Sequence, residues 1–402
     1  MAEAVIVAAT RSAIGRANKG SLVDFRPDDL SATIVDAVLN KVPALDRQQV
    51  EDIIWGCAQP AGEAGTKIAR VTAILAGMPD VPGTTVNRYC SSSLQTIRMA
   101  AHAIRAGEGD VFVSGGVETV SRFQFGMADG GPKNEKFEPA NNRTKERSLG
   151  GAPTWTPLDG AYPDVYTSMG ETAENVAQYM QVSRQEQDEF AALSQQRAVA
   201  AQERGHFEME ITPVTKPDGT IVNKDDGPRA GTTVEKLSEL KPVFRPDGTV
   251  TAGNACPLND GAAAVVVMSD NRARELGIAP LARIIASGVT GLNPEIMGLG
   301  PIEACRQAMK RAGMTIDDID LVEINEAFAA QVVPSAKELG IPWDKLNVNG
   351  GAIALGHPFG MTGARIMTTL LHNLEETGKT IGMESMCVGG GQGMAMIVER
   401  LS

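Results

Sequence analysis

The sequence has few cysteines, few aromatic residues and no long hydrophobic run. Its five cysteines, an odd number, are scattered over 402 residues, and aromatic residues make up 4%. Such a set argues against a disulfide framework and favours a reducing compartment. The longest purely apolar run, residues 262–268, is too short to cross a membrane. The first residues (MAEAVIVAATRSAIG) are typical of a strand rather than of a signal peptide. We therefore expect a cytoplasmic protein that binds no membrane.

Basic residues are in the minority. Lys and Arg number 37 against 49 Asp and Glu, which gives a formal net charge of −12. Nucleic acid is not an expected partner, because neutralising phosphates requires a basic surface. A small anionic ligand held by a few local cations is compatible with this charge. The cysteines also lack the CxxC or Cys/His spacing of a zinc site, so we expect no metal.

Short β-branched runs alternate with amphipathic helical stretches, which is typical of an α/β protein. In the first part of the chain we expect strands at 4–8, 52–56, 84–86 and 110–114 and helices at 29–40, 67–76 and 92–107. After a buried strand at 262–269, the last part repeats this order, with strands at 283–286, 319–324, 346–348, 380–385 and 394–398 and helices at 301–312, 327–338 and 360–374. The polar stretch 122–250 carries one expected helix, at 172–204.

This repetition predicts two copies of one α/β unit. We expect a first half formed by residues 1–121 and 252–277, and a second half formed by residues 278–402. Residues 122–251 form an insert, which we expect to be a subdomain because a structureless loop of this length would be unusual. The alternative is a single doubly wound sheet with a long insert.

Cys90, in VNRYCSSSLQ, lies where a short strand meets a helix. A thiol at a helix amino terminus is close to the positive end of the helix dipole, which favours the thiolate. The other interpretation is a buried small hydrophobic residue, the usual role of a lone cysteine.

Two further residues lie in glycine-rich turns. His357, in NGGAIALGHPFGMTGAR, precedes a proline that fixes the backbone, so the turn presents an imidazole that could act as a base near neutral pH. Cys387, in CVGGGQG, ends a buried strand at a turn whose backbone amides could form an oxyanion site.

Asn325, in EINEAFAAQ, follows another buried strand. It could cap the next helix or belong to the site. These four positions follow strands of both halves and are expected at one edge of the sheets, where α/β proteins bind ligands.

Four blocks, VNRYCSSSLQ, NEAFAAQ, NGGAIALGHPFGMTGAR and CVGGGQG, together resemble the signature blocks of the thiolase family. They occur in the family's order, and the resemblance spans essentially the whole chain. It implies a thiolase-like fold: two pseudo-symmetric αβαβαββ halves that form a layered α/β/α/β/α core, with an inserted loop subdomain. It also implies an acyltransferase that uses coenzyme A as co-substrate, has no prosthetic group and forms homodimers or homotetramers.

The resemblance also implies a role for each site residue. Cys90 would carry the acyl group, activated by His357, and Cys387 would exchange a proton with the α-carbon. Asn325 would hold a water that stabilises the enolate oxygen together with His357. The amides of Cys90 and Gly389 would form a second oxyanion hole.

For coenzyme A, the resemblance implies contacts mainly from the insert. Arg229 would lie over the adenine, and the pantetheine arm would contact the apolar residues Leu240, Phe244, Ala252 and Met169. Ala327 and Phe328 would close the site. Cys256 replaces a family serine that hydrogen-bonds the pantetheine, and a thiol is a weaker donor.

The motif CSSSLQ is closer to the degradative form of the family motif than to the biosynthetic CGSGL form. We therefore expect cleavage of 3-ketoacyl-CoA to acetyl-CoA and a shortened acyl-CoA in fatty acid β-oxidation. The alternative is formation of acetoacetyl-CoA from two acetyl-CoA. A less favoured alternative is a non-catalytic homologue that binds acyl-CoA or lipid. Condensing enzymes of the ketoacyl-synthase kind share the fold but have no cysteine at the position of Cys387.

Overall fold

The computed structural model describes residues 2–216 and 218–402. Within them a ten-stranded sheet runs through both halves of the chain. The first half supplies β1 (Ala4–Arg11), β2 (Gly15–Arg16), β3 (Asp52–Gly56), β4 (Gly83–Val86), β5 (Val111–Thr119) and β8 (Asn259–Ser269). The second half supplies β9 (Ala282–Gly291), β10 (Leu321–Ile324), β11 (Ile381–Val388) and β12 (Gln392–Arg400). A separate pair, β6 (Val214–Thr215) and β7 (Ile221–Val222), lies in the insert.

The two halves have the same strand order. Across the sheet, the first half has the order β4-β3-β5-β8-β1 and the second half has the order β10-β11-β12-β9. The first strand of each half in the chain, β1 or β9, therefore lies where the two halves meet. The halves meet where β1 pairs antiparallel with β9 at Val5–Arg283 and Ile6–Ala282. The prediction of two pseudo-symmetric halves is thus confirmed, and each half begins with a strand.

The strand predicted at 346–348, which would complete the second half, was wrong. Only one parallel bridge forms there, between Leu346 and Val322. Asn347 has a left-handed backbone (φ 45°), and its side chain accepts from the N–H of Ile324 and donates to its carbonyl oxygen, both at 2.9 Å. The side-chain amide therefore takes over the pairing that a strand backbone would have made.

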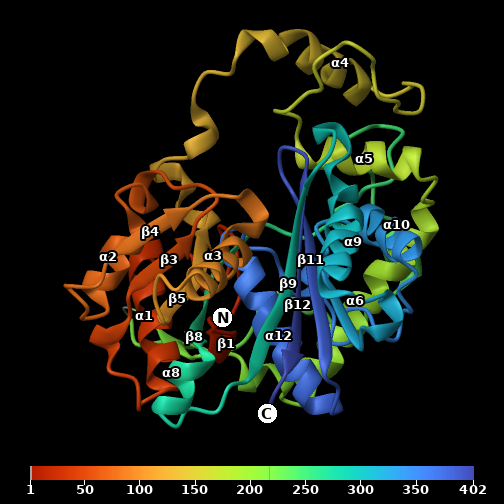
Figure 1. The fold of residues 1–402 in the computed structure, drawn as a ribbon. Helices are drawn as coiled ribbons and strands as arrows, with labels where there is room; N and C mark the ends of the chain where they lie inside the picture. The colour runs from red at the N-terminus through yellow and green to blue at the C-terminus, as the bar shows by residue number, and fades with distance from the viewer. Residues whose placement is uncertain (1, 217) are drawn as a thin grey trace.

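Helices form three layers around these strands. The outer layer on the first half contains α1 (Pro27–Asn40) and α2 (Ile68–Leu75), and the outer layer on the second half contains α9 (Gly300–Ala312) and α10 (Ala329–Leu339). Between the two sets of strands lie α3 (Ser92–Ala106) and α12 (Thr362–Thr377), which pack on each other and on strands (Figure 1). This is the layered α/β/α/β/α arrangement predicted for the fold.

The side chains of α12 explain its place in the middle layer. Its residues from Thr362 to Leu371 are all buried, whereas surface helices keep one polar face. Gly363 permits close contact with α3, because a Cβ there would lie 2.5 Å from the backbone nitrogen of Leu94. The start of α12 is therefore fixed against the helix that follows Cys90.

The insert contains more helices than predicted. The expected single helix at 172–204 was wrong, since the chain forms α5 (Met169–Tyr179) and α6 (Arg184–Glu203). Gln181 between them is left-handed (φ 54°), and Ser183 caps α6 through a capping box with Glu186. The insert also holds α4 (Glu138–Ser148), at the top of Figure 1, and α7 (Val234–Ser238). Two short helices complete the set, α8 (Asp270–Glu275) and α11 (Ala352–Leu355).

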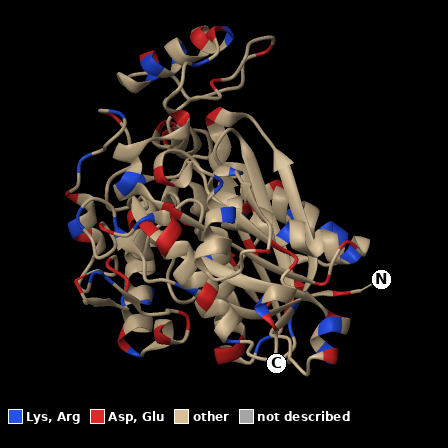
Figure 2. Ribbon diagram, turned by 90° about the vertical axis from the view of Figure 1, so that its left-hand side faces the viewer, with Lys and Arg blue, Asp and Glu red and all other residues tan. Residues whose placement is uncertain are grey.

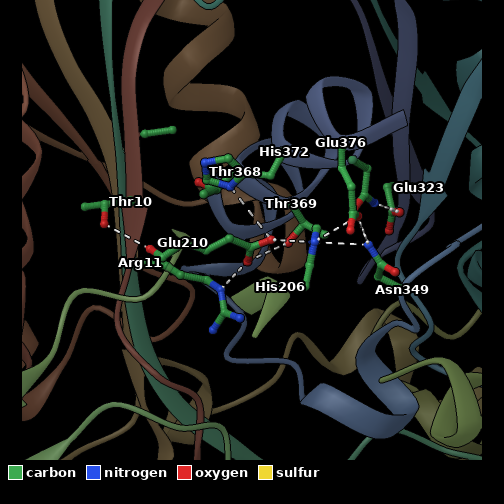
Figure 3. Close-up of polar contacts among 12 residues, drawn as sticks. Thr10, Arg11, His206, Glu210, Glu323, Asn349, Thr368, Thr369, His372 and Glu376 are labelled. Atoms are coloured by element: carbon green, nitrogen blue, oxygen red, sulfur yellow. Dashed lines mark hydrogen bonds and ion pairs between the residues drawn. The ribbon is translucent and has the colours of Figure 1, made fainter. Parts of the chain in front are cut away.

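A buried polar cluster joins the insert to both halves (Figure 3). Arg11 of β1 donates from Nε to Glu210 at 2.7 Å and from both terminal nitrogens to Asp225. Glu210 also accepts from Thr369 of α12 at 3.1 Å. Burial would raise the pKa of Glu210, but the charge and hydrogen bond of Arg11, together with the hydrogen bond of His206 and the charge of His372, outweigh burial and lower the pKa to about 2. The carboxylate is thus charged at neutral pH and holds the insert against the core.

Charged residues are distributed over the whole molecule. In the view of Figure 2, lysines and arginines are interspersed with acidic residues rather than gathered into one band. No helix among the residues that the structure describes is both long and apolar enough to cross a membrane.

Candidate active site

The four residues of the predicted site come from both halves and are all buried. Cys90 lies in a 3-10 turn, Tyr89–Ser91, between β4 and α3, and Asn325 directly follows β10. His357 follows α11, and Cys387 is near the end of β11. Cys90 and Gly389 line a cavity of about 460 Å³, and residues 128–133 and 165–169 of the insert form its other side.

The turn that holds Cys90 is strained and hydrogen-bonded. Tyr89 has a left-handed backbone (φ 41°), an unfavourable conformation for a bulky residue, which is found mainly where function requires it. The hydroxyl of Ser92 fixes the turn, because it accepts from the N–H of Arg88 at 2.9 Å and donates to the carbonyl of Tyr89 at 2.7 Å. The sulfur is thereby fixed at the cavity wall.

The pKa of Cys90 differs from the expectation. Burial raises it to about 11, although the backbone amides of Gly389 and of Cys90 itself lower it in part. The predicted lowering by the helix dipole was therefore wrong in its net sign, because desolvation of the thiolate is the larger effect. At neutral pH the residue is a thiol that needs a base.

Cys387 lies close enough to Cys90 for their charges to interact. Burial raises the pKa of Cys387 well above its usual value, and a charge on Cys90 or Cys256 raises it further. Cys387 packs in an apolar cluster with Ala327 and Phe328. Three thiols from different segments therefore surround the inner end of the site.

His357 is held as a neutral imidazole of defined tautomer. Burial, followed by the charge of Arg365, lowers its pKa to about 3. Its Nδ1 lies 2.7 Å from the hydroxyl of Thr362, whose single proton is donated to the carbonyl of Pro358 at 2.7 Å. Nδ1 must then carry the ring proton, which leaves the lone pair on Nε2. The site thus combines a thiol with an imidazole that can accept a proton.

We expect Thr362→Val to lower the turnover number about fivefold, because the loss of a hydrogen bond of about 1 kcal/mol no longer fixes the tautomer and ring orientation of His357. Thr368→Val is the matched control, since that hydroxyl donates to the carbonyl of Ala364 on the same helix without touching the imidazole. Steady-state kinetics with saturating substrates measures both variants. Equal turnover in Thr362→Val and the wild-type protein would contradict this role.

Asn325 lies beside His357 and does not cap a helix. The next helix, α10, begins at Ala329 with Phe328 at its amino-terminal cap position. The Asn325 side chain places Nδ2 3.4 Å from Nε2 of His357, which matches the lone pair there. Its Oδ1 is buried and has no partner among the described residues. An unpartnered acceptor beside the imidazole is suited to holding a water molecule.

The residues predicted to contact coenzyme A fall into three groups. Met169, Phe244, Cys256, Ala327 and Phe328 gather in one cluster beside Cys387. Leu240, in the insert, and Ala252, directly after it, are exposed. Arg229 does not line the cavity at Cys90, and it borders a separate hollow of about 220 Å³ beside α6. The structure therefore gathers part of the proposed pantetheine contacts beside Cys387, whereas Leu240, Ala252 and the proposed adenine contact Arg229 lie outside this cluster.

Some site residues had no signal in the sequence. Asn259 accepts from the backbone N–H of His357 at 3.0 Å, and Thr362 orients its ring. Glu118 accepts from the N–H of Gly360 in the same loop at 2.9 Å. Both Asn259 and Glu118 lie in strands, so their contacts depend on the register of the fold. Across residues 2–216 and 218–402 no group of three or more His, Cys, Asp or Glu side chains is placed to hold a metal ion.

Comparison with known proteins agrees with this geometry. The family model described as "Thiolase, N-terminal domain" matches residues 4–271, and "Thiolase, C-terminal domain" matches residues 278–400. The chain is 44% identical to the beta-ketoadipyl-CoA thiolase of Acinetobacter baylyi and 45% identical to the 3-ketoacyl-CoA thiolase of Aeromonas hydrophila, with 100% of each chain covered in both cases. It is 43% identical to the 3-oxoadipyl-CoA/3-oxo-5,6-dehydrosuberyl-CoA thiolase of Escherichia coli K12, again over 100% of both chains.

A solved structure shows the same fold. The acetyl-CoA acetyltransferase of Bacillus anthracis superposes with a TM-score of 0.85 at 38% identity, covering 100% of this chain and 99% of that one. The chain belongs to the thiolase family. It is accordingly an acyltransferase that acts on coenzyme A thioesters, as the resemblance implied.

Proposed function

We propose that the enzyme cleaves a 3-ketoacyl-CoA with free coenzyme A, giving acetyl-CoA and an acyl-CoA shortened by two carbons. The observation that supports this proposal is that Cys387 lies within range of the charge of Cys90, and that Phe359, which packs against the neutral imidazole of His357, lines the cavity at Cys90. A thiol with a pKa of about 11 requires a base, and the lone pair on Nε2 of His357 supplies it. The degradative form of the Cys90 motif supports cleavage over condensation.

In the first half-reaction, Nε2 of His357 takes the proton of Cys90 while the sulfur of Cys90 bonds to the C3 carbonyl carbon of the 3-ketoacyl-CoA. The C2–C3 bond then breaks, and its electron pair goes to C2 as the enolate of acetyl-CoA. Asn325, through a water, and His357 stabilise the enolate oxygen. Cys387 gives its proton to C2, which leaves an acyl group on Cys90 and a thiolate at Cys387.

In the second half-reaction, the thiol of coenzyme A attacks the acyl group on Cys90 and its proton passes to Cys387. The amides of Cys90 and Gly389 stabilise the tetrahedral oxyanion, a contribution of about 10²–10³ in rate for each donor. The sulfur of Cys90 leaves and recovers its proton from His357. Each group ends in its starting protonation state.

The acyl tail defines a second candidate substrate class. Fatty acid β-oxidation requires an apolar tail, whereas several relatives are named for substrates that carry a second carboxylate. Lys133 lines the cavity with its ammonium 5.2 Å from the ring centroid of Tyr166, and it forms no ion pair among the described residues. Asp129 also lines the cavity, but its carboxylate accepts hydrogen bonds from Gln59 and Tyr89. The Lys133 cation favours a tail that ends in a carboxylate.

Spectrophotometric thiolysis of acetoacetyl-CoA, a medium-chain 3-ketoacyl-CoA and 3-ketoadipyl-CoA tests both points. We expect thiolysis to be faster than condensation of two acetyl-CoA. Lys133→Met is expected to lower kcat/KM for 3-ketoadipyl-CoA about fivefold and to leave kcat/KM for acetoacetyl-CoA unchanged, since an exposed ion pair contributes at most about 1 kcal/mol. Lys136→Met, outside the cavity, is the control. An absence of thiolysis with all three substrates would contradict the proposed function.

We also predict a cytoplasmic location and an assembly of two or four copies of the chain. Light scattering tests the assembly.

A further inference from the structure

The proposed reaction gives no role to Glu118, a buried carboxylate beside the site. Glu118, at the carboxyl end of β5, is 2% exposed. Its Oε2 accepts from the N–H of Ala58 and of Gly360, both at 2.9 Å, and its Oε1 accepts from the N–H of Gln59 at 3.2 Å. Among the residues that the structure describes, no lysine, arginine or histidine forms an ion pair with it.

These hydrogen bonds join segments from both halves of the chain. Ala58 and Gln59 follow β3, whereas Gly360 lies in the loop that carries His357. Glycines allow the segments to approach closely, because a Cβ at Gly360 would collide with the carbonyl oxygen of Val117 and a Cβ at Gly116 with that of Gly360. The carboxylate thus lies at the point where the His357 loop crosses β5.

The same segments form the walls of the cavity. Ala58 and Gln59 line it together with Phe359, the residue before Gly360. The ring of Phe359 packs edge-on against the imidazole of His357, with centroids 5.2 Å apart. A shift of the loop would therefore move both the base and the wall opposite the acyl group.

We propose that Glu118 is a positioning residue for acyl transfer: its carboxylate fixes the loop of His357 against the segment that follows β3. This inference rests on the proposed roles of Cys90 and His357. Both carboxylate oxygens face N–H donors, so only the ionised form satisfies all of them. A neutral side chain would turn a donor toward another donor.

The charges around Glu118 define its pH dependence. Cys57 donates its S–H to Oε1 at 3.8 Å, Cys90 lies within Coulombic range, and the ion-paired Glu63 and Arg122 face it across a narrow hollow. His357, on the opposite loop, is neutral. Burial raises the pKa of Glu118 to about 7, against the lowering effect of its amide hydrogen bonds. The carboxylate is protonated as the pH falls through about 7, so turnover is expected to decline on the acid side.

The test is the isosteric change Glu118→Gln, with Glu51→Gln as matched control. Glu51 precedes β3 and accepts from the N–H of Asp110, which precedes β5, so it joins the same two strands at their opposite ends. We expect Glu118→Gln to lower kcat about 10²-fold, the scale of a misplaced catalytic group, with KM for coenzyme A within threefold. It should also lose the acid limb near pH 7, because it mimics the protonated form at every pH. The control is expected to retain both.

If Glu118→Gln does not fold, Glu118→Asp is the second test variant. Its shorter side chain keeps the charge but cannot reach the N–H groups of Ala58, Gln59 and Gly360 together, so kcat is expected to fall in this variant too. A kcat within twofold of wild type in either folded variant, or an equal loss in Glu51→Gln, would overturn the inference. A wild-type protein without thiolysis would instead count against the proposed function, so the two failures are distinguishable.

Discussion

Cys90→Ala is expected to lower thiolysis by on the order of 10⁴-fold or more, the scale seen when an enzyme loses its nucleophile. Cys90 is the expected acyl carrier, because the amides of Gly389 and Cys90 face its sulfur and Cys90, unlike Cys387 and Cys256, lines the cavity. Steady-state thiolysis of acetoacetyl-CoA measures the loss. Cys305→Ala, a buried cysteine within α9, is the control and is expected to keep full activity.

Alkylation of Cys90 provides a second measurement of the same prediction. Because its pKa is about 11, the thiolate fraction and hence the rate of inactivation by iodoacetamide are expected to rise about tenfold per pH unit between pH 7 and 10. Mass spectrometry identifies the modified residue. Full activity of protein alkylated at Cys90 would refute the acyl-enzyme, and a pH-independent rate would refute the neutral thiol.

Cys387→Ala is expected to separate the two half-reactions. The variant should still accept an acetyl group from acetyl-CoA on Cys90, since His357 and the backbone amides are intact and coenzyme A can leave as a thiolate without the proton of Cys387. Thiolysis of a 3-ketoacyl-CoA should fall by about 10²–10⁴-fold, because no group would donate the proton to C2. Mass spectrometry of the intact protein measures acetylation, and the thiolysis assay measures turnover.

The contrast between the two measurements is the test of Cys387. Normal turnover would show that another group protonates the enolate, with Cys256 the neighbouring thiol. Loss of acetylation as well as of turnover would show instead that the substitution disturbed Cys90. Cys305→Ala again controls for the removal of a buried thiol.

Element identity could be predicted from the sequence wherever local pattern and tertiary context agree. Residues 52–56 were predicted as a strand with the bounds that the structure gives β3, because their apolar run is buried on both faces. The break between α5 and α6 was not predicted, although Ser183 and Glu186 match the sequence pattern of a capping box. The sequence there is helix-forming on both sides, and the left-handed Gln181 leaves no clear signal.

The chemistry of the site could be predicted less completely. The residue types and their positions at strand ends indicated Cys90, His357, Cys387 and Asn325. The net pKa of Cys90 could not be predicted, because it depends on how much water the fold removes from the sulfur. Glu118 was missed for a related reason: its partners are backbone amides, which carry no residue identity.

The shared strand order of the two halves has a consequence for what each half could do alone. Of the four residues of the proposed site, the first repeat contributes Cys90, whereas the second contributes Asn325, His357 and Cys387. A protein made of the first repeat alone would have the proposed nucleophile without the proposed proton donor, and a protein made of the second repeat alone would have the proton donor without the nucleophile. Neither repeat alone could therefore carry out the proposed reaction, because the proposed nucleophile and its proposed proton donor come from different repeats.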